Sequence, residues 1–91
     1  MRGFEYDVRR TENGYEVEVP VPGFRPEDVE VTFQDNVISV NAKGERRSFA
    51  RSFMVPEDVN PDAIEAHVSN GMLVVSLARR PEVQPRRITV K

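Results

Sequence analysis

Ala66-His67-Val68-Ser69-Asn70-Gly71-Met72-Leu73 joins two apolar segments through an Asn-Gly pair. Asn and Gly tolerate the positive φ angles that the two central residues of a tight hairpin turn adopt. Before the pair, Ile64, Ala66 and Val68 alternate with polar residues, and after it the stretch 72–77 is almost wholly apolar. The pattern predicts two antiparallel strands that meet at Asn70-Gly71.

Alternation with a period of two extends over most of the chain, and no useful length shows a helical period. Short strands separated by turn residues at roughly regular spacing are typical of a β-sandwich. We therefore predict an all-β, immunoglobulin-like antiparallel β-sandwich of about seven strands, with a short turn between Pro56 and Asp62. The expected strands cover residues 4–8, 15–21, 29–33, 37–42, 48–55, 64–69 and 72–78.

Length and composition bound the molecule to one small domain. The chain has 91 residues, of which 38% are hydrophobic and 31% charged, and it has no cysteine for a disulfide or a thiolate metal site. We expect residues 1–80 to form the sandwich and residues 81–91 an extended tail, because the stretch from Pro81 to Pro85 cannot pair as a central strand.

The same properties predict where the protein works and what it does not bind. The N-terminus lacks the apolar stretch of a secretory signal, and no apolar run could cross a bilayer, so a cytoplasmic location and no membrane contact are expected. A net charge of −2 argues against a nucleic-acid partner. The basic residues near the C-terminus are interpreted as a solvated tail.

Catalytic and metal-binding residues are poorly represented. His67 is the only histidine, and its alternation with Glu65 and Ser69 places it toward solvent. The acidic pairs 27–28 and 57–58 each follow a proline in a turn, and no third oxygen or nitrogen ligand recurs at a fixed offset. The sequence therefore predicts no enzyme activity, no metal site and no cofactor.

Three motifs together resemble the α-crystallin domain of small heat-shock proteins, the Hsp20 family. The first is A-x-x-x-N-G-x-L, formed by Ala66, Asn70, Gly71 and Leu73. The second is a proline-glycine bend at 19–24 followed by Glu27-Asp28-Val29-Glu30-Val31. The third is Ile88-Thr89-Val90, which is similar to the I-x-I/V tail motif through which members of this family assemble.

The resemblance implies a function and a binding groove. It implies an ATP-independent chaperone of the stress response that holds partly unfolded client proteins, with self-association through the tail residues Ile88 and Val90. The receiving groove would lie between the strands 29–33 and 64–69, although the same side chains would serve core packing in any sandwich. The residues implied for client or tail binding are Val29, Val31, Phe33, Ile64, Ala66 and Val68.

Arg51 stands in an otherwise apolar row with Phe49, Phe53 and Val55. Family members carry an arginine five residues before the proline that ends this strand, and Arg51 has that place before Pro56. Two interpretations stay open. Arg51 is either an edge arginine that covers the core with its stem or one half of an ion pair across a subunit interface.

The chain departs from its family at two places. Almost nothing precedes Phe4, where the family has a long variable arm, and the sequence does not decide between an excised domain and a minimal member. The connection from Lys43 to Ser48 is too short to carry the strand that bacterial and plant members swap between subunits. We therefore expect a simple hairpin there, and a monomer or a weak dimer without strand exchange.

Two other classes share this type of sandwich. A co-chaperone or scaffold domain of the p23 and CS type is the main alternative, although the absence of tryptophan and the presence of the tail motif count against it. A carbohydrate-binding sandwich lacks the aromatic platform on which a sugar would stack.

Overall fold

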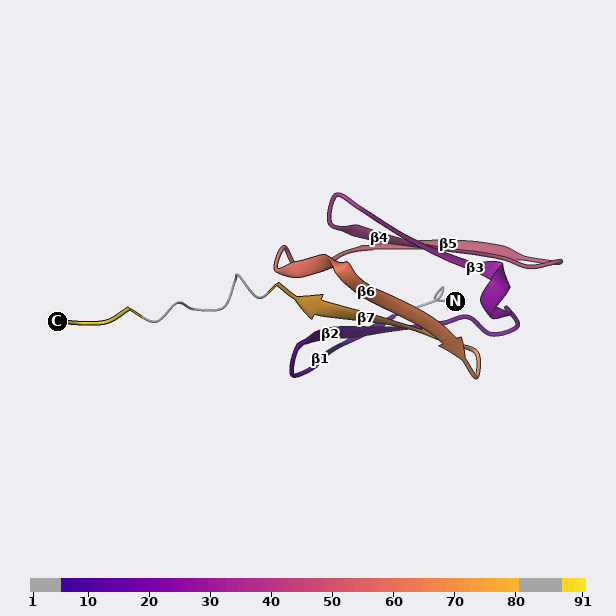
Figure 1. The fold of residues 1–91 in the computed structure, drawn as a ribbon. Coiled ribbons are helices and arrows are strands. Elements are labelled where there is room, and N and C mark those ends of the chain that lie inside the picture. The colour runs from indigo at the N-terminus through magenta and orange to yellow at the C-terminus, as the bar shows by residue number, and fades with distance from the viewer. Residues whose placement is uncertain (1–5, 81–87) are drawn as a thin grey trace.

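The computed structural model describes residues 6–80 and 88–91, and its strands, which lie between residues 7 and 79, form two antiparallel sheets packed face to face (Figure 1). The strands are β1 (Asp7–Arg10), β2 (Gly14–Pro20), β3 (Val29–Gln34), β4 (Val37–Lys43), β5 (Ser48–Met54), β6 (Val59–Ser69) and β7 (Met72–Arg79), and a short 3₁₀ turn, η1 (Pro26–Asp28), precedes β3. The expected all-β sandwich is thereby confirmed.

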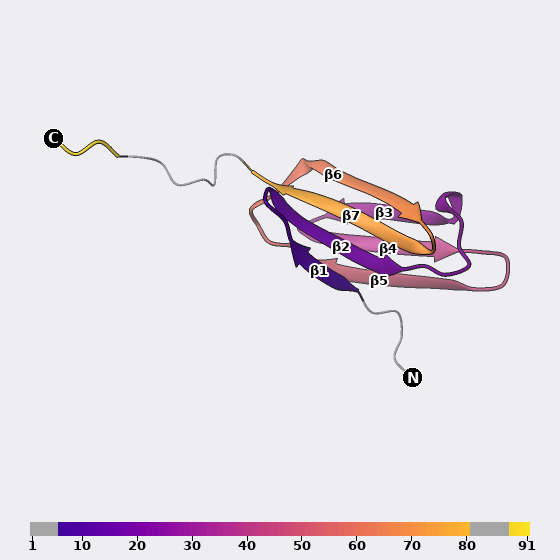
Figure 2. The same ribbon diagram turned by 90° about the horizontal axis from the view of Figure 1, so that it is seen from below.

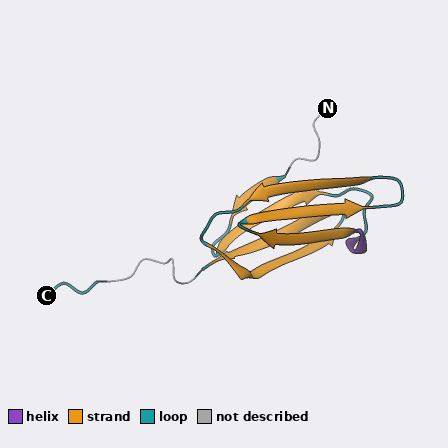
Figure 3. Ribbon diagram, turned by 90° about the horizontal axis from the view of Figure 1, so that it is seen from above, coloured by secondary structure: helices purple, strands orange, loops and turns teal. Residues whose placement is uncertain are grey.

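One sheet has four strands in the order β1-β2-β7-β6, and the other has three in the order β3-β4-β5. The view in Figure 2 shows that β6 and β3 border one side of the sandwich, whereas β1 and β5 border the other. Figure 3 shows η1 at the end of the sandwich where β3 begins. The order leaves four edge strands, two on each open side.

The core lies between the inner faces of the two sheets. Val17 and Val19 of β2 and Leu73 and Val75 of β7 meet Ile38 and Val40 of β4, and each is at most 1% exposed. Every second residue of these strands points inward, as the alternation predicts. No charged or polar residue among the described ones is buried, so the core is wholly apolar.

Two tight turns have positive φ at both central residues. Asn70 has φ of 53° and Gly71 of 75°, and Asp35 and Asn36 have 54° and 62°. Both turns join neighbouring antiparallel strands, β6 to β7 and β3 to β4, and the first is the turn that Asn70-Gly71 predicts. The Gly71 carbonyl also accepts a hydrogen bond of 2.8 Å from the Val21 amide, which ties this turn to the end of β2.

The expected turn between Pro56 and Asp62 is wrong in extent. Only residues 57 and 58 form a turn, and β6 already begins at Val59, which pairs with Arg79. The pairing then slips until Ile64 meets Leu77. Pro61 lies in this irregular part of β6, which is an edge strand. The amide hydrogen that proline lacks is therefore not needed for a hydrogen bond between strands.

Most other strand ends agree with the expectation or differ from it by one residue, but the first strand covers Asp7–Arg10 instead of residues 4–8. Phe4 and the linker from Pro81 to Pro85 lie outside the described residues. Residues 88–91 are described and form no strand. None of the described segments is a helix long and apolar enough to cross a membrane.

Gly71→Val should destabilise the fold, because a β-branched residue is strained at a φ of +75°. A Cβ there would meet its nearest neighbour, Pro22, at 3.8 Å, so the cost is conformational rather than steric. We expect a loss of more than about 1 kcal/mol and a melting temperature lower by at least about 4 °C. Gly71→Asn is the matched control, since Asn adopts positive φ readily, and equal melting of the two variants would contradict the turn geometry.

Candidate binding groove and interface residues

A groove opens between the edge strands β3 and β6, where no further strand of the described segments bridges the two sheets. Its lining combines β3, β6, the start of β7 and the first residue of η1, and its volume is about 130 Å³. An engineered apolar cavity of about 150 Å³ holds one benzene, so the groove has room for roughly one aliphatic side chain. The lining residues are Pro26, Val29, Val31, Ala66, His67, Val68 and Leu73.

Four of the six residues proposed for this groove lie in it. Val29, Val31 and Val68 are half-buried and pack against the core, and Ala66 is exposed at the rim. Phe33 and Ile64 do not line the cavity. Both are half-buried against the core, toward the other end of the two strands.

Sequence reasoning missed three lining residues, namely Pro26, His67 and Leu73, of which Leu73 was assigned only to the turn motif. Pro26 opens η1 directly before β3, and the Pro-Glu-Asp stretch after the bend at Gly23 was a visible sign of a turn beside the groove. His67 is exposed, as expected from alternation, yet it also borders the groove because β6 is an edge strand. Alternation gives the face of a residue, but it does not show that an outward residue on an edge strand can reach around the rim.

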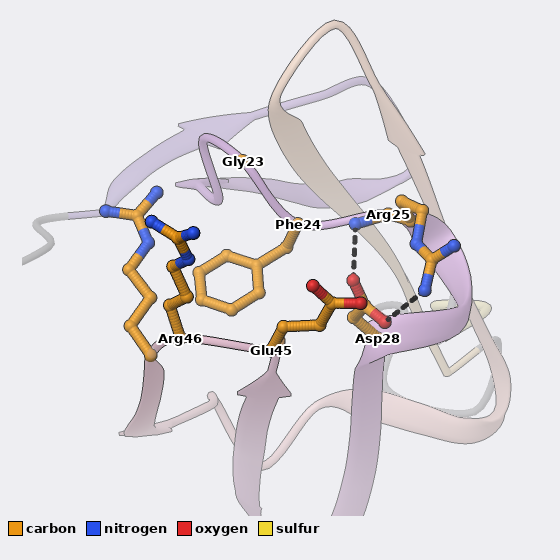
Figure 4. Close-up of a pocket in the computed structure, with 8 residues that line it drawn as sticks. Gly23, Phe24, Arg25, Asp28, Glu45 and Arg46 are labelled. Carbon is orange, nitrogen blue, oxygen red and sulfur yellow. Dashed lines mark hydrogen bonds and ion pairs between the residues drawn. The ribbon is translucent and has the colours of Figure 1, made fainter.

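The mouth of the groove is held by η1. The Arg25 amide donates a hydrogen bond of 2.9 Å to Asp28 Oδ2, and the Arg25 guanidinium lies 3.5 Å from Asp28 Oδ1 (Figure 4). The amide bond chiefly, with the guanidinium, holds the pKa of the Asp28 carboxyl below its usual value. Asp28 thus closes the turn that presents Pro26 to the groove.

A second hollow lies beside η1, at the tip of the β4–β5 hairpin. It has a volume of about 420 Å³ and is lined by residues 23–25, Asp28 and residues 44–47 (Figure 4). The Arg47 guanidinium donates to the Pro22 carbonyl and lies 5.3 Å from the centre of the Phe24 ring. A Cβ on Gly23 would come within 2.6 Å of this guanidinium. The hairpin tip is therefore fastened to the proline-glycine bend.

The connection from Lys43 to Ser48 is the simple hairpin that its length predicts. Lys43 pairs with Ser48, and the Gly44 amide donates a hydrogen bond of 2.9 Å to the Arg47 carbonyl. No strand extends from it toward another subunit.

Arg51 lies on the opposite open side of the sandwich, between β1 and β5. Its guanidinium stands 5.3 Å from the centre of the Tyr6 ring, and that ring stacks on Phe53 at 4.8 Å. The Nε atom is buried and has no hydrogen-bond partner among residues 6–80 and 88–91. Arg51 covers the core edge in the single chain, and its role in an interface stays a prediction.

The tail residues proposed for docking are free in this single chain. Ile88 is 83% exposed and Val90 is 90% exposed. These two apolar side chains would become buried only if the tail bound to another surface.

The fold and motifs define the class of small heat-shock proteins, and the comparisons agree. The family model described as "Hsp20/alpha crystallin family" matches residues 7–91. The small heat-shock protein from Xylella fastidiosa superposes with a TM-score of 0.79 at 27% identity, over 99% of this chain and 97% of that one. HspA from Xanthomonas axonopodis gives 0.75 at 26% identity, over 86% and 94%. The chain belongs to the Hsp20/alpha crystallin family.

Relatives among curated proteins are longer than this chain. Spore protein SP21 of Stigmatella aurantiaca (strain DW4/3-1) is 37% identical over 93% of this chain and 60% of its own length. Small heat shock protein C2 of Rickettsia felis (strain ATCC VR-1525 / URRWXCal2) is 27% identical over 93% and 66%. The alignment with SP21 extends over 101 positions, more than the 91 residues of this chain, so SP21 has extra residues inside the matched region.

Asp28→Asn keeps an oxygen for the Arg25 amide and removes the charge. Because the pKa of Asp28 is lowered in the folded chain, the carboxylate stabilises the fold above the ordinary aspartate pKa, and this contribution is lost as the pH falls from that value through the lowered pKa of the folded chain. We expect the variant to melt below the parent at pH 7, with the gap closing below about pH 3.9. Thermal unfolding followed by circular dichroism across pH measures it, with exposed Glu12→Gln as control, and a gap that persists in acid would contradict the assignment.

Proposed function

We propose that this domain is an ATP-independent holdase, which binds apolar segments of partly unfolded proteins and so keeps them from aggregating. The observation that carries the proposal is the open groove between β3 and β6, with an apolar floor and two edge strands beside it. An unpaired edge offers backbone donors and acceptors to a partner strand. The sequence contains no G-x-x-x-x-G-K-[ST] loop, and we propose no nucleotide cycle.

Binding would occur by addition of an extended segment along the groove. Main-chain hydrogen bonds to an edge strand give affinity, and alternate side chains enter the pocket. Val29, Val31 and Val68 would contact the inserted side chain, and Ala66 at the rim leaves space for the backbone. Ile88 and Val90 are both exposed, and they would bind in the groove in the same way, in place of a client segment.

The small volume sets the strength of the interaction. Burying one aliphatic side chain contributes about 1.5–3 kcal/mol, whereas association costs about 4 kcal/mol or more in lost freedom. One groove would therefore bind weakly and release readily. Firm holding of a client would need several grooves acting together.

The main alternative is a co-chaperone or scaffold domain, which would bind a folded partner. Both functions use edges and grooves of the same sandwich, so they differ in the client and not in the fold. A holdase suppresses aggregation of an unrelated heat-labile protein, whereas a scaffold leaves it unchanged.

Light scattering of a heat-labile client should be suppressed by the parent protein and less so by Ala66→Glu. Ala66 is exposed at the groove rim, so the substitution places a charge at the groove without opening the core. Ser69→Glu is the matched control, because Ser69 is exposed on the same strand and does not line the groove. Equal suppression by both variants would remove the groove from the proposal, and no suppression by the parent would favour the scaffold.

Assembly is expected to stop at a monomer or a weak dimer, because the hairpin at 43–48 carries no strand to exchange. A dimer would use the open edge of β5, where the Arg51 Nε, which lacks a hydrogen-bond partner in the described part of the chain, would meet a carboxylate. Arg51→Glu should then weaken dimerisation in sedimentation over a wide concentration range. A stable assembly of about twelve or more subunits would overturn the expectation, and a tight dimer indifferent to the substitution would refute the edge assignment.

A further inference from the structure

We infer that Asn70, in the turn between β6 and β7, is a site of spontaneous chemical modification, at which deamidation converts the asparagine to aspartate or isoaspartate. The turn combines an exposed asparagine with a glycine directly after it. Asparagine is among the thermolabile residues of proteins. The modification itself does not depend on the holdase function proposed above, but β6 and β7 carry its consequence to the groove.

The reaction needs only water besides the groups of the turn. The backbone nitrogen of Gly71 loses its proton to hydroxide and attacks the side-chain Cγ of Asn70, and the new C–N bond closes a cyclic imide. The side-chain nitrogen takes up a proton from water and leaves as ammonia. Water then opens the imide at either carbonyl carbon, which gives aspartate or, with the main chain routed through Cγ, isoaspartate. Glycine favours the attack because it has no side chain in the way and the widest choice of backbone conformations.

The sequence limits this reaction to two asparagines. The asparagines at 36, 41 and 60 are followed by valine, alanine and proline. A side chain on the following residue hinders the attack, and a proline nitrogen has no proton to lose. Asn13 and Asn70 are each followed by glycine, so the chain contains two chemically identical dipeptides.

The Asn13-Gly14 dipeptide is held firmly. It lies at the opposite end of the four-stranded sheet from the β6–β7 turn (Figures 1 and 2). The Asn13 carbonyl accepts a hydrogen bond of 2.9 Å from the Arg79 amide, and the Gly14 carbonyl accepts one of 2.9 Å from Thr11. Gly14 is also buried, and a Cβ there would clash with the Leu77 carbonyl oxygen. The backbone of this dipeptide therefore has little room to rearrange.

The Asn70-Gly71 dipeptide is held less firmly. The Asn70 side chain is exposed and makes no hydrogen bond with residues 6–80 or 88–91. The turn is tied to β2 by the hydrogen bond from the Val21 amide to the Gly71 carbonyl, and the nearest atom to a Cβ on Gly71 would be 3.8 Å away, in Pro22. Ring closure swings the Gly71 nitrogen toward Cγ, so the turn has to open first. Opening costs less where fewer contacts hold the backbone.

Isoaspartate would disturb the hairpin because it adds a methylene group to the main chain. Asn70 and Gly71 join β6 to β7 with φ angles of 53° and 75°, a geometry specific to a two-residue turn. A longer connection would strain the adjoining pair of Val68 and Leu73, and both of these residues line the groove. Conversion of Asn70 should therefore weaken the hairpin and the groove together.

Peptide mapping by mass spectrometry measures both sites after the full chain has been stored in mildly alkaline buffer. We expect Asn70 to convert at least roughly fivefold faster than Asn13, since at least one more hydrogen bond must break at Asn13. In urea the two rates should become equal, because the dipeptides are the same and the fold no longer protects either. Equal rates in the folded chain would overturn the assignment. It would also be overturned if the folded chain protected both sites and urea exposed them.

A matched variant separates the added charge from the longer main chain. Asn70→Asp carries the charge of the product, and aspartate adopts positive φ as asparagine does, so this variant should melt close to the parent. Anion exchange separates the aged protein by its additional negative charge, and a protease that cleaves at aspartate but not at isoaspartate distinguishes the two products. The isoaspartate fraction should melt at a lower temperature than Asn70→Asp. Equal melting would contradict the strain on the hairpin.

Discussion

Two apolar sheet faces must cover each other, and in this chain they do so without closing into a barrel. The inner residues of β2 and β7 are fully buried against those of β4, while β3 and β6 on one side and β1 and β5 on the other remain edges. Every binding role proposed for the molecule depends on this incomplete closure. A bridging strand would satisfy the backbone groups of β3 and β6 and would remove the groove with its seven lining residues.

The fold could be read from the sequence because burial in a sandwich alternates strictly. Val17, Val19 and Val21 alternate with polar residues or proline and are all buried, and Asn70-Gly71 fixes where β6 turns into β7. The start of β6 could not be read, because Pro61 suggested an end to pairing, whereas an edge strand with a slipped register tolerates a missing donor. The residues around a proline do not show whether its backbone nitrogen faces solvent or a neighbouring strand.

The groove was only partly predictable for a related reason. Val29, Val31, Ala66 and Val68 follow from alternation and from the resemblance to small heat-shock proteins, but the same reasoning included Phe33 and Ile64, which face the core beyond the cavity. Pro26 and His67 depend on how η1 and an edge strand approach each other in space. Likewise, alternation places Arg51 in the apolar row of β5, but only the packing of Tyr6 on Phe53 shows what the guanidinium covers.

The composition of the core affects how the groove can act. Six of the eight largest fully buried side chains are valines, at positions 17, 19, 21, 40, 59 and 75, and the others are Ile38 and Leu73. A β-branched side chain has one strongly preferred χ1 rotamer in many settings, and it gives up little conformational entropy on burial. The interior is therefore stiff although the chain has no cysteine for a disulfide. When a segment fills the groove, the sandwich has little freedom left to lose, and the entropic cost of ordering falls almost wholly on the incoming strand.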